Sequence, residues 1–245
     1  FVKVLNYFLT LGKDQSCLDL SVNIHNHLIY YGPFVNLLCV FTDKFISPFG
    51  LYETRHIIIS LFGFIAVLYT GLTAQRVSNW RTACLAFIFI LLTPFFFGSA
   101  MNNQKDIPFA AFYIVSLFYI MLFIKQLPKP QFSTKLFLIL AMGITMSIRV
   151  AGMLMFAYLG LFMAIYWIVQ YRKQGAKVAK KLFLQFFKLY LVVVFFAYLI
   201  GILFWPYALQ NPISGPFTAL REFEKFSLVH IWELFDGVKY YMKDF

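Results

Sequence analysis

A short polar segment, SAMNNQKDIPFA at residues 99–110, separates two strongly apolar runs. It contains Asn103, Lys105 and Asp106, and Asp106 is the only acidic residue between positions 53 and 222. Carboxylate and amide oxygens suit a hard divalent cation, whereas an ammonium group and a helix N-terminus suit a phosphate. The segment therefore predicts a site in which Asp106 and Asn103 are metal ligands and Lys105 binds an anionic headgroup.

The same carboxylate has a simpler interpretation. Asp106 precedes Pro108 by two residues, and proline favours the first turn of a helix. A carboxylate at that point accepts hydrogen bonds from free backbone N–H groups. Capping and ligand binding both remain open from the sequence.

Two arginines also stand beside apolar runs. Arg149 lies between Ile148 and Val150, and a charge at membrane depth costs at least about 2.5 kcal/mol unless it is paired or reaches the surface. If Arg149 faces inward, we expect it beside the Asp106 segment, where a guanidinium suits a lipid-linked phosphate. Arg55 opens the first long apolar run, where it either anchors a helix among headgroups or lines the same cavity.

Other chemistry is weakly supported. His25 and His27 raise the question of a metal, but no cysteine or carboxylate pattern accompanies them. The three cysteines lack metal-ligand spacing. The basic residues are not interleaved with aromatic ones in one patch, which excludes a nucleic-acid partner.

The composition indicates the medium in which these residues work. Of 245 residues, 61% are hydrophobic and 13% charged, and the mean hydropathy is +0.76. A water-soluble domain cannot hide so much apolar surface, so we predict an integral membrane protein in contact with lipids. The net charge of +11 is then expected in cytoplasmic loops.

Six apolar runs are candidate membrane helices, each judged against the ~20 residues that a bilayer requires. The runs are Ile57–Leu72, Ala83–Phe97, Pro108–Ile124, Leu136–Ile148, Ala151–Val169 and Leu182–Phe204. The fourth run, Leu136–Ile148, is too short to span alone, so we expect a hairpin or broken pair that turns at SIRVAG, residues 147–152.

Basic residues gather in alternate connections, at positions 76–81, 125–135 and 172–181. The positive-inside rule places these loops in the cytoplasm and all ten acidic residues on the outer face. We predict an all-α transmembrane bundle of about six helices with outer-face juxtamembrane helices. Residues 1–56 form the first outer segment, 57–204 the bundle and 205–245 an outer loop. Short outer helices are expected at Tyr30–Ile46 and Phe217–Phe226.

The order of several motifs resembles one family. YYGPF at residues 30–34 precedes Arg55, then come NNQKDIPFA and GITMSIRVAG, and FWPYALQNP with a later LFDG closes the series. This order is similar to the membrane domain of GT-C glycosyltransferases, in particular the protein mannosyltransferase family 39 and the lipid A aminoarabinose transferases.

The resemblance implies a polyprenyl-phosphate sugar donor and transfer to a protein or lipid acceptor on the periplasmic face of the inner membrane. It implies that Asp106 is the acidic residue of the second outer loop, that Arg149 and Lys105 lie near the donor phosphate, and that Arg55 helps shape the cavity.

The sequence departs from the family pattern at one important point. The family's catalytic carboxylate would fall before Phe1, so no catalytic residue is assigned, and we expect the chain to be a fragment of a longer protein. A non-catalytic subunit of a membrane complex is the alternative function. A transporter is a third, although no repeated half is visible.

Overall fold

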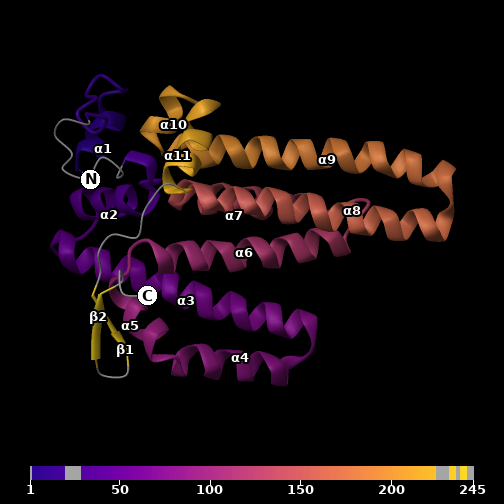
Figure 1. Cartoon of the computed structure of the whole chain (residues 1–245), viewed down its shortest axis with the longest axis horizontal. Helices are drawn as coiled ribbons and strands as arrows, with labels where there is room; N and C mark the ends of the chain where they lie inside the picture. Colours follow the sequence, from indigo (N-terminus) through magenta and orange to yellow (C-terminus); the bar gives the residue numbers. More distant parts are fainter. Residues whose placement is uncertain (1, 20–28, 225–231, 236–237, 242–245) are drawn as a thin grey trace.

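The computed structural model describes residues 2–19, 29–224, 232–235 and 238–241 of the chain (Figure 1). Within them, helices dominate and a two-stranded antiparallel hairpin, β1 (Trp232–Phe235) and β2 (Val238–Tyr241), follows the last helix. The predicted all-α membrane bundle is confirmed, and the hairpin has no counterpart among the predicted elements. The helices are α1 (Val2–Leu9), α2 (Phe34–Phe45), α3 (Leu51–Val77), α4 (Trp80–Leu92), α5 (Pro94–Asn102), α6 (Asp106–Lys125), α7 (Phe132–Ile148), the 3-10 turn η2 (Val150–Met153), α8 (Leu154–Gln174), α9 (Ala176–Leu203), α10 (Pro206–Gln210) and α11 (Ser214–Glu224).

The long helices correspond to the apolar runs of the sequence. Among the described residues, four helices are long and apolar enough to cross a membrane, and the bent pair α4–α5 makes a fifth. Helix α7, with 17 residues, is a shorter apolar helix. Because large apolar side chains of α3, α4, α8 and α9 remain exposed, the bundle is built to contact lipid over much of its surface.

The second apolar run differs from its prediction as one continuous helix. It is broken between α4 and α5, whose axes differ by 71°. Thr93 is extended, with φ of −77° and ψ of 107°, and Pro94 begins α5. Proline disfavours helical geometry in the preceding residue and supplies no N–H to an α-helix interior, so the chain turns at this point.

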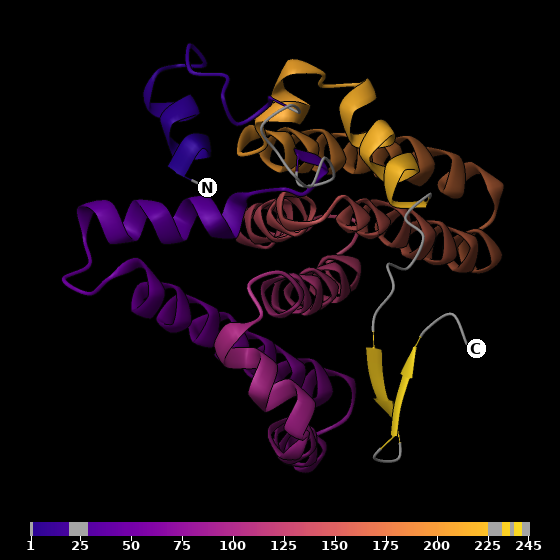
Figure 2. The ribbon, with the colours of Figure 1, turned by 60° about the vertical axis from the view of Figure 1, so that its left-hand side comes forward.

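The long helices form one row in the order α4, α3, α6, α7 and α9 (Figure 1). Helix α8 packs on α9 and α6, while α2 lies across one end of the row, against α3 and α7. The view in Figure 2 shows α1 above α2, and α10 and α11 beside the end of α9. Helix α6 lies at the middle of the row, between α3 and α7.

The basic connections lie at one end of the bundle. In Figure 1 the α3–α4, α6–α7 and α8–α9 connections are all on the right, with the α8–α9 connection farthest out. The Lys125 ammonium donates to the carbonyl of Arg76 at 3.3 Å, and Gln185, inside α9, donates to the carbonyl of Pro128 in the α6–α7 connection at 2.8 Å. The α5–α6 loop, the α7–α8 turn, and α1, α2 and α10 lie at the opposite end.

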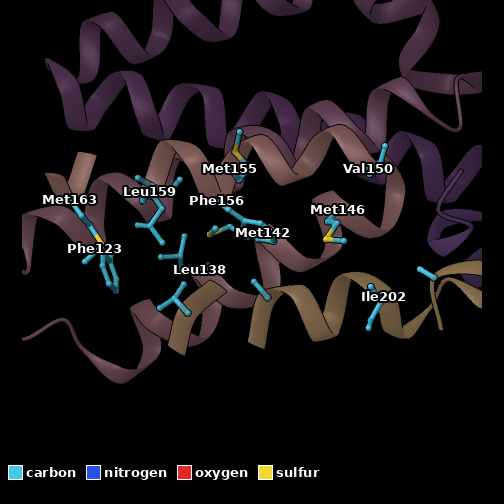
Figure 3. Packing of buried hydrophobic residues seen from close by; sticks show 14 of the residues in the cluster. Phe123, Leu138, Met142, Met146, Val150, Met155, Phe156, Leu159, Met163 and Ile202 are labelled. Atoms are coloured by element: carbon cyan, nitrogen blue, oxygen red, sulfur yellow. The ribbon is translucent and has the colours of Figure 1, made fainter. Parts of the chain in front are cut away.

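Helix α7 and the turn after it form the predicted hairpin. Met142 and Met146 of α7 belong to one buried cluster with Met155, Phe156 and Leu159 of α8, through which the chain returns (Figure 3). These side chains are almost fully buried, in a cluster that also includes residues of α6 and α9. A helix at the limit of spanning length is therefore stabilised by packing on several sides.

We expect Gly143→Ala to destabilise the bundle. An added Cβ would lie 2.7 Å from Cβ of Ile200 and 2.8 Å from the carbonyl oxygen of Ala197 on α9. Overpacking of this kind costs about 1–3 kcal/mol, more than the ~1 kcal/mol that alanine gains over glycine in a helix. Gly98→Ala, in α5, is the control, since nothing lies within 4 Å of its added Cβ. Thermal unfolding in detergent should show a lower Tm for Gly143→Ala and an equal or higher Tm for Gly98→Ala, and equal Tm changes would contradict this packing.

Candidate anion site at one end of the bundle

The α5–α6 loop is folded by Asn103. Its Oδ1 accepts hydrogen bonds from the backbone N–H groups of Lys105 at 3.1 Å and Asp106 at 2.9 Å, and its Nδ2 donates to Asp106 Oδ2 at 2.9 Å. Helix α6 begins at Asp106, two residues before Pro108. Asn103, rather than Asp106, therefore accepts a hydrogen bond from the first backbone N–H group of the helix. The Asp106 carboxylate is left to interact with another part of the chain.

That interaction is an ion pair with Arg149. The Arg149 guanidinium nitrogen Nη1 donates to Asp106 Oδ1 at 2.6 Å. Arg149 has an extended backbone, with φ of −143° and ψ of 135°, between the end of α7 and the 3-10 turn. The side chains of Arg149 and Asp106 are 36% and 56% exposed, so the pair lies at the surface of this end of the bundle. The structure thus brings together two residues that lie 43 positions apart.

A second cation lies beside the pair. The Lys105 ammonium is 3.9 Å from the centroid of the Tyr31 ring, and the Arg149 guanidinium carbon is 5.9 Å from the same centroid. Both distances lie within cation–π range. We refer to Tyr31, Lys105, Asp106 and Arg149 as the Tyr31 cluster.

The Tyr31 cluster carries more positive than negative charge. Burial lowers the pKa of Lys105, repulsion from Arg149 lowers it further, and attraction to Asp106 opposes both. One carboxylate faces two cations and is already bound to one of them. A phosphate here would receive charge-assisted hydrogen bonds and would relieve the repulsion between Lys105 and Arg149.

Tyr31 reaches the cluster because Gly32 packs against the last turn of α7. A Cβ placed on Gly32 would lie 1.9 Å from the carbonyl oxygen of Ser147, so only glycine allows this approach of two backbones. The sequence marked YYGPF as a motif but did not single out Tyr31 as a site residue. The available signal for Tyr31 was an aromatic residue beside Gly-Pro. Only the tertiary contact shows that its ring lies beside Lys105 and Arg149.

Arg55 is the predicted site residue that the described contacts do not join to the cluster. It lies near Cys39 of α2, and its Nε is buried without a hydrogen-bond partner in the described part of the chain. Burial raises the pKa of the Cys39 thiol to about 11, and the Arg55 charge opposes that rise. A direct role of Arg55 in binding the donor phosphate stays a prediction.

The residues predicted to hold a divalent cation already make hydrogen bonds within the protein, and a metal at Asp106 and Asn103 stays a prediction. Both carboxylate oxygens of Asp106 already accept hydrogen bonds, one of them from the cationic Arg149, and Asn103 Oδ1 accepts from two backbone N–H groups. No group of three or more His, Cys, Asp or Glu side chains suited to a metal occurs among the described residues. His25 and His27 lie outside them.

Together these observations define an integral membrane protein whose α-helical bundle carries a cationic cluster at the end opposite its lysine- and arginine-rich loops. Comparison of the chain with protein-family models, with curated proteins and with solved structures finds no match.

Proposed function

We propose that this chain is the membrane portion of a GT-C-type glycosyltransferase that uses a polyprenyl-phosphate sugar donor. One observation carries the proposal: Lys105 and Arg149 lie in different connections between helices, yet both contact the ring of Tyr31. The contact lies at the ends of membrane helices. A phosphate at the head of a lipid would reach this position while its isoprenoid tail remained among the exposed apolar side chains of the bundle. The order of motifs in the sequence gives independent support.

The orientation of the site follows from charge. The basic connections lie at the opposite end of the bundle, and the positive-inside rule assigns that end to the cytoplasm. The Tyr31 cluster then faces the periplasm of a bacterial inner membrane, where a protein or lipid acceptor is available.

In the proposed reaction, a nucleophilic group of the acceptor attacks the anomeric carbon of the sugar. The bond from that carbon to the phosphate oxygen breaks, and polyprenyl phosphate leaves with the electron pair. The acceptor proton passes to a general base, for which this chain offers no assigned residue. Arg149 and Lys105 stabilise the negative charge that grows on the departing phosphate, which is the part of the reaction these residues can perform.

Binding of matched lipids tests the proposal. The protein in lipid nanodiscs is titrated with radiolabelled decaprenyl phosphate and with decaprenol, which has the same tail and no phosphate. We expect decaprenyl phosphate to bind at least about tenfold more tightly, because a phosphate gains charge-assisted hydrogen bonds here. Equal affinities would overturn the proposal.

A transfer assay then separates an enzyme from a scaffold. The longest available protein that contains this chain is incubated with decaprenyl phosphate carrying a radiolabelled sugar and with a membrane extract as a source of acceptors. Label in protein or lipid products supports the glycosyltransferase. Phosphate-dependent binding without transfer would instead identify a non-catalytic lipid-binding subunit.

A further inference from the structure

A cavity of about 190 Å³ adjoins the Tyr31 cluster. Tyr31 and Lys105 line both, so the cavity is continuous with the proposed phosphate site. Its other walls come from α1, α2, the end of α7 and the segment that joins α9 to α10. Segments distant in the sequence therefore enclose one space at this end of the bundle.

Two residues that line this cavity have buried side-chain oxygens without hydrogen-bond partners in the described part of the chain. Asn36, in the first turn of α2, is only 6% exposed, and its Oδ1 has no partner within the described part of the chain. Gln104, in the α5–α6 loop, has a buried Oε1 in the same condition, and both residues line the cavity. Buried polar atoms are almost always hydrogen-bonded, so two such acceptors on residues that line one cavity favour a ligand that carries hydrogen-bond donors. An isoprenoid or acyl chain has none.

The remaining lining fits a small ring with hydroxyl groups. Tyr31, Trp205 and Tyr207 present aromatic surface to the cavity, and Lys105 supplies positive charge at its edge. The volume exceeds the ~150 Å³ of a cavity that holds benzene but lies below the ~300 Å³ at which pockets for drug-sized molecules begin. One monosaccharide unit suits this size.

We propose that this cavity binds the sugar of the lipid-linked donor, with sugar hydroxyl groups donating to Asn36 Oδ1 and Gln104 Oε1 while the phosphate lies on Lys105 and Arg149. This inference rests on the proposed function, because the sugar enters the cavity as part of the donor. Asn36 and Gln104 are then the residues that distinguish a glycosylated lipid from the bare phosphate.

Lipids that differ only in the sugar test this assignment. Affinities are measured in nanodiscs for decaprenyl phosphate and for decaprenyl phosphate linked to glucose, mannose, galactose, N-acetylglucosamine or 4-amino-4-deoxyarabinose. At least one glycosylated lipid should bind about tenfold more tightly than decaprenyl phosphate, as expected for one or two added hydrogen bonds. If none does, the cavity does not bind the sugar.

Variants assign the gain to particular atoms. Asn36→Leu and Gln104→Leu should each remove most of the tenfold gain and leave the affinity for decaprenyl phosphate within about twofold of the wild type. Gln104 is only partly buried, so its variant is expected to fold even if Asn36→Leu does not. Asn102→Leu is the matched control, since Asn102 is exposed and does not line the cavity.

The outcomes separate the two proposals. If decaprenyl phosphate and decaprenol bind equally, the proposed function fails. If decaprenyl phosphate binds but no sugar adds affinity, or if a folded Gln104→Leu variant keeps the sugar gain, the cavity holds water only and this inference alone fails. An equal loss for both lipids in Gln104→Leu would show a structural role and would also overturn it.

Discussion

Replacing Arg149 with alanine is expected to weaken the binding of decaprenyl phosphate by about 10- to 100-fold. Arg149 holds the only guanidinium of the Tyr31 cluster, 5.9 Å from the Tyr31 centroid and 2.6 Å from Asp106. A hydrogen bond to a charged group contributes about 1.5–3 kcal/mol, and each 1.4 kcal/mol changes affinity tenfold. Equilibrium binding in nanodiscs measures the effect, and transfer by the intact protein should fall at least as much.

The ion pair predicts a different result for its acidic partner. Asp106→Asn removes the carboxylate that orients Arg149 but keeps the guanidinium, so we expect transfer to fall at least about tenfold while decaprenyl phosphate still binds. Arg172→Ala is the control for charge, because Arg172 is exposed at the opposite end of the bundle. All variants should still insert into membranes. Full activity of both Arg149→Ala and Asp106→Asn would contradict the assignment of the site.

Gly32→Ala is expected to have the second large effect. The added Cβ would meet the carbonyl oxygen of Ser147 at 1.9 Å, and neither backbone can give way without displacing Tyr31 or the turn that carries Arg149. Forced backbone shifts of this kind cost about 1–3 kcal/mol, occasionally more. We expect a lower Tm and at least a tenfold loss of affinity for decaprenyl phosphate.

A matched variant separates the local effect from a general one. Gly143→Ala also introduces a close contact, but in the α7–α9 interface rather than at the Tyr31 cluster. It should lower Tm with less effect on affinity measured well below the unfolding temperature. If Gly32→Ala bound decaprenyl phosphate like the wild type, the contact between Gly32 and Ser147 would not position the site.

Hydropathy alone located the long unbroken membrane helices. Apolar runs such as Pro108–Ile124 and Leu182–Phe204 correspond closely to α6 and α9, because a chain in lipid must satisfy its backbone hydrogen bonds within each segment. The break at Pro94 was missed, since the apolar run continues across it and the turn leaves no mark on hydropathy. Pro94 was the available signal for the break, because proline disfavours helical geometry in the residue before it and so ends α4.

The Asp106 segment shows the other limit of sequence reasoning. Topology predicted correctly that it shares one end of the bundle with Arg149, and the two side chains pair. The capping role belongs to Asn103 instead, because which oxygen meets the helix N–H groups depends on loop geometry. Hydrogen bonds within that loop also involve the two predicted metal ligands, Asn103 and Asp106.

The sequence by itself determined that this is a membrane protein, where its long helices lie and which connections share an end. Hydropathy and charge are local properties, and they decide which segments enter lipid and which loops stay in the cytoplasm. Only the tertiary structure decided that Tyr31 faces both Lys105 and Arg149 and that Arg55 lies near Cys39. It also decided that Asn36 and Gln104, whose side-chain oxygens have no partner among the described residues, line one cavity. These features depend on the close approach of segments that are distant in the chain. Glycine permits that approach, as at Gly32, and no local sequence pattern predicts it.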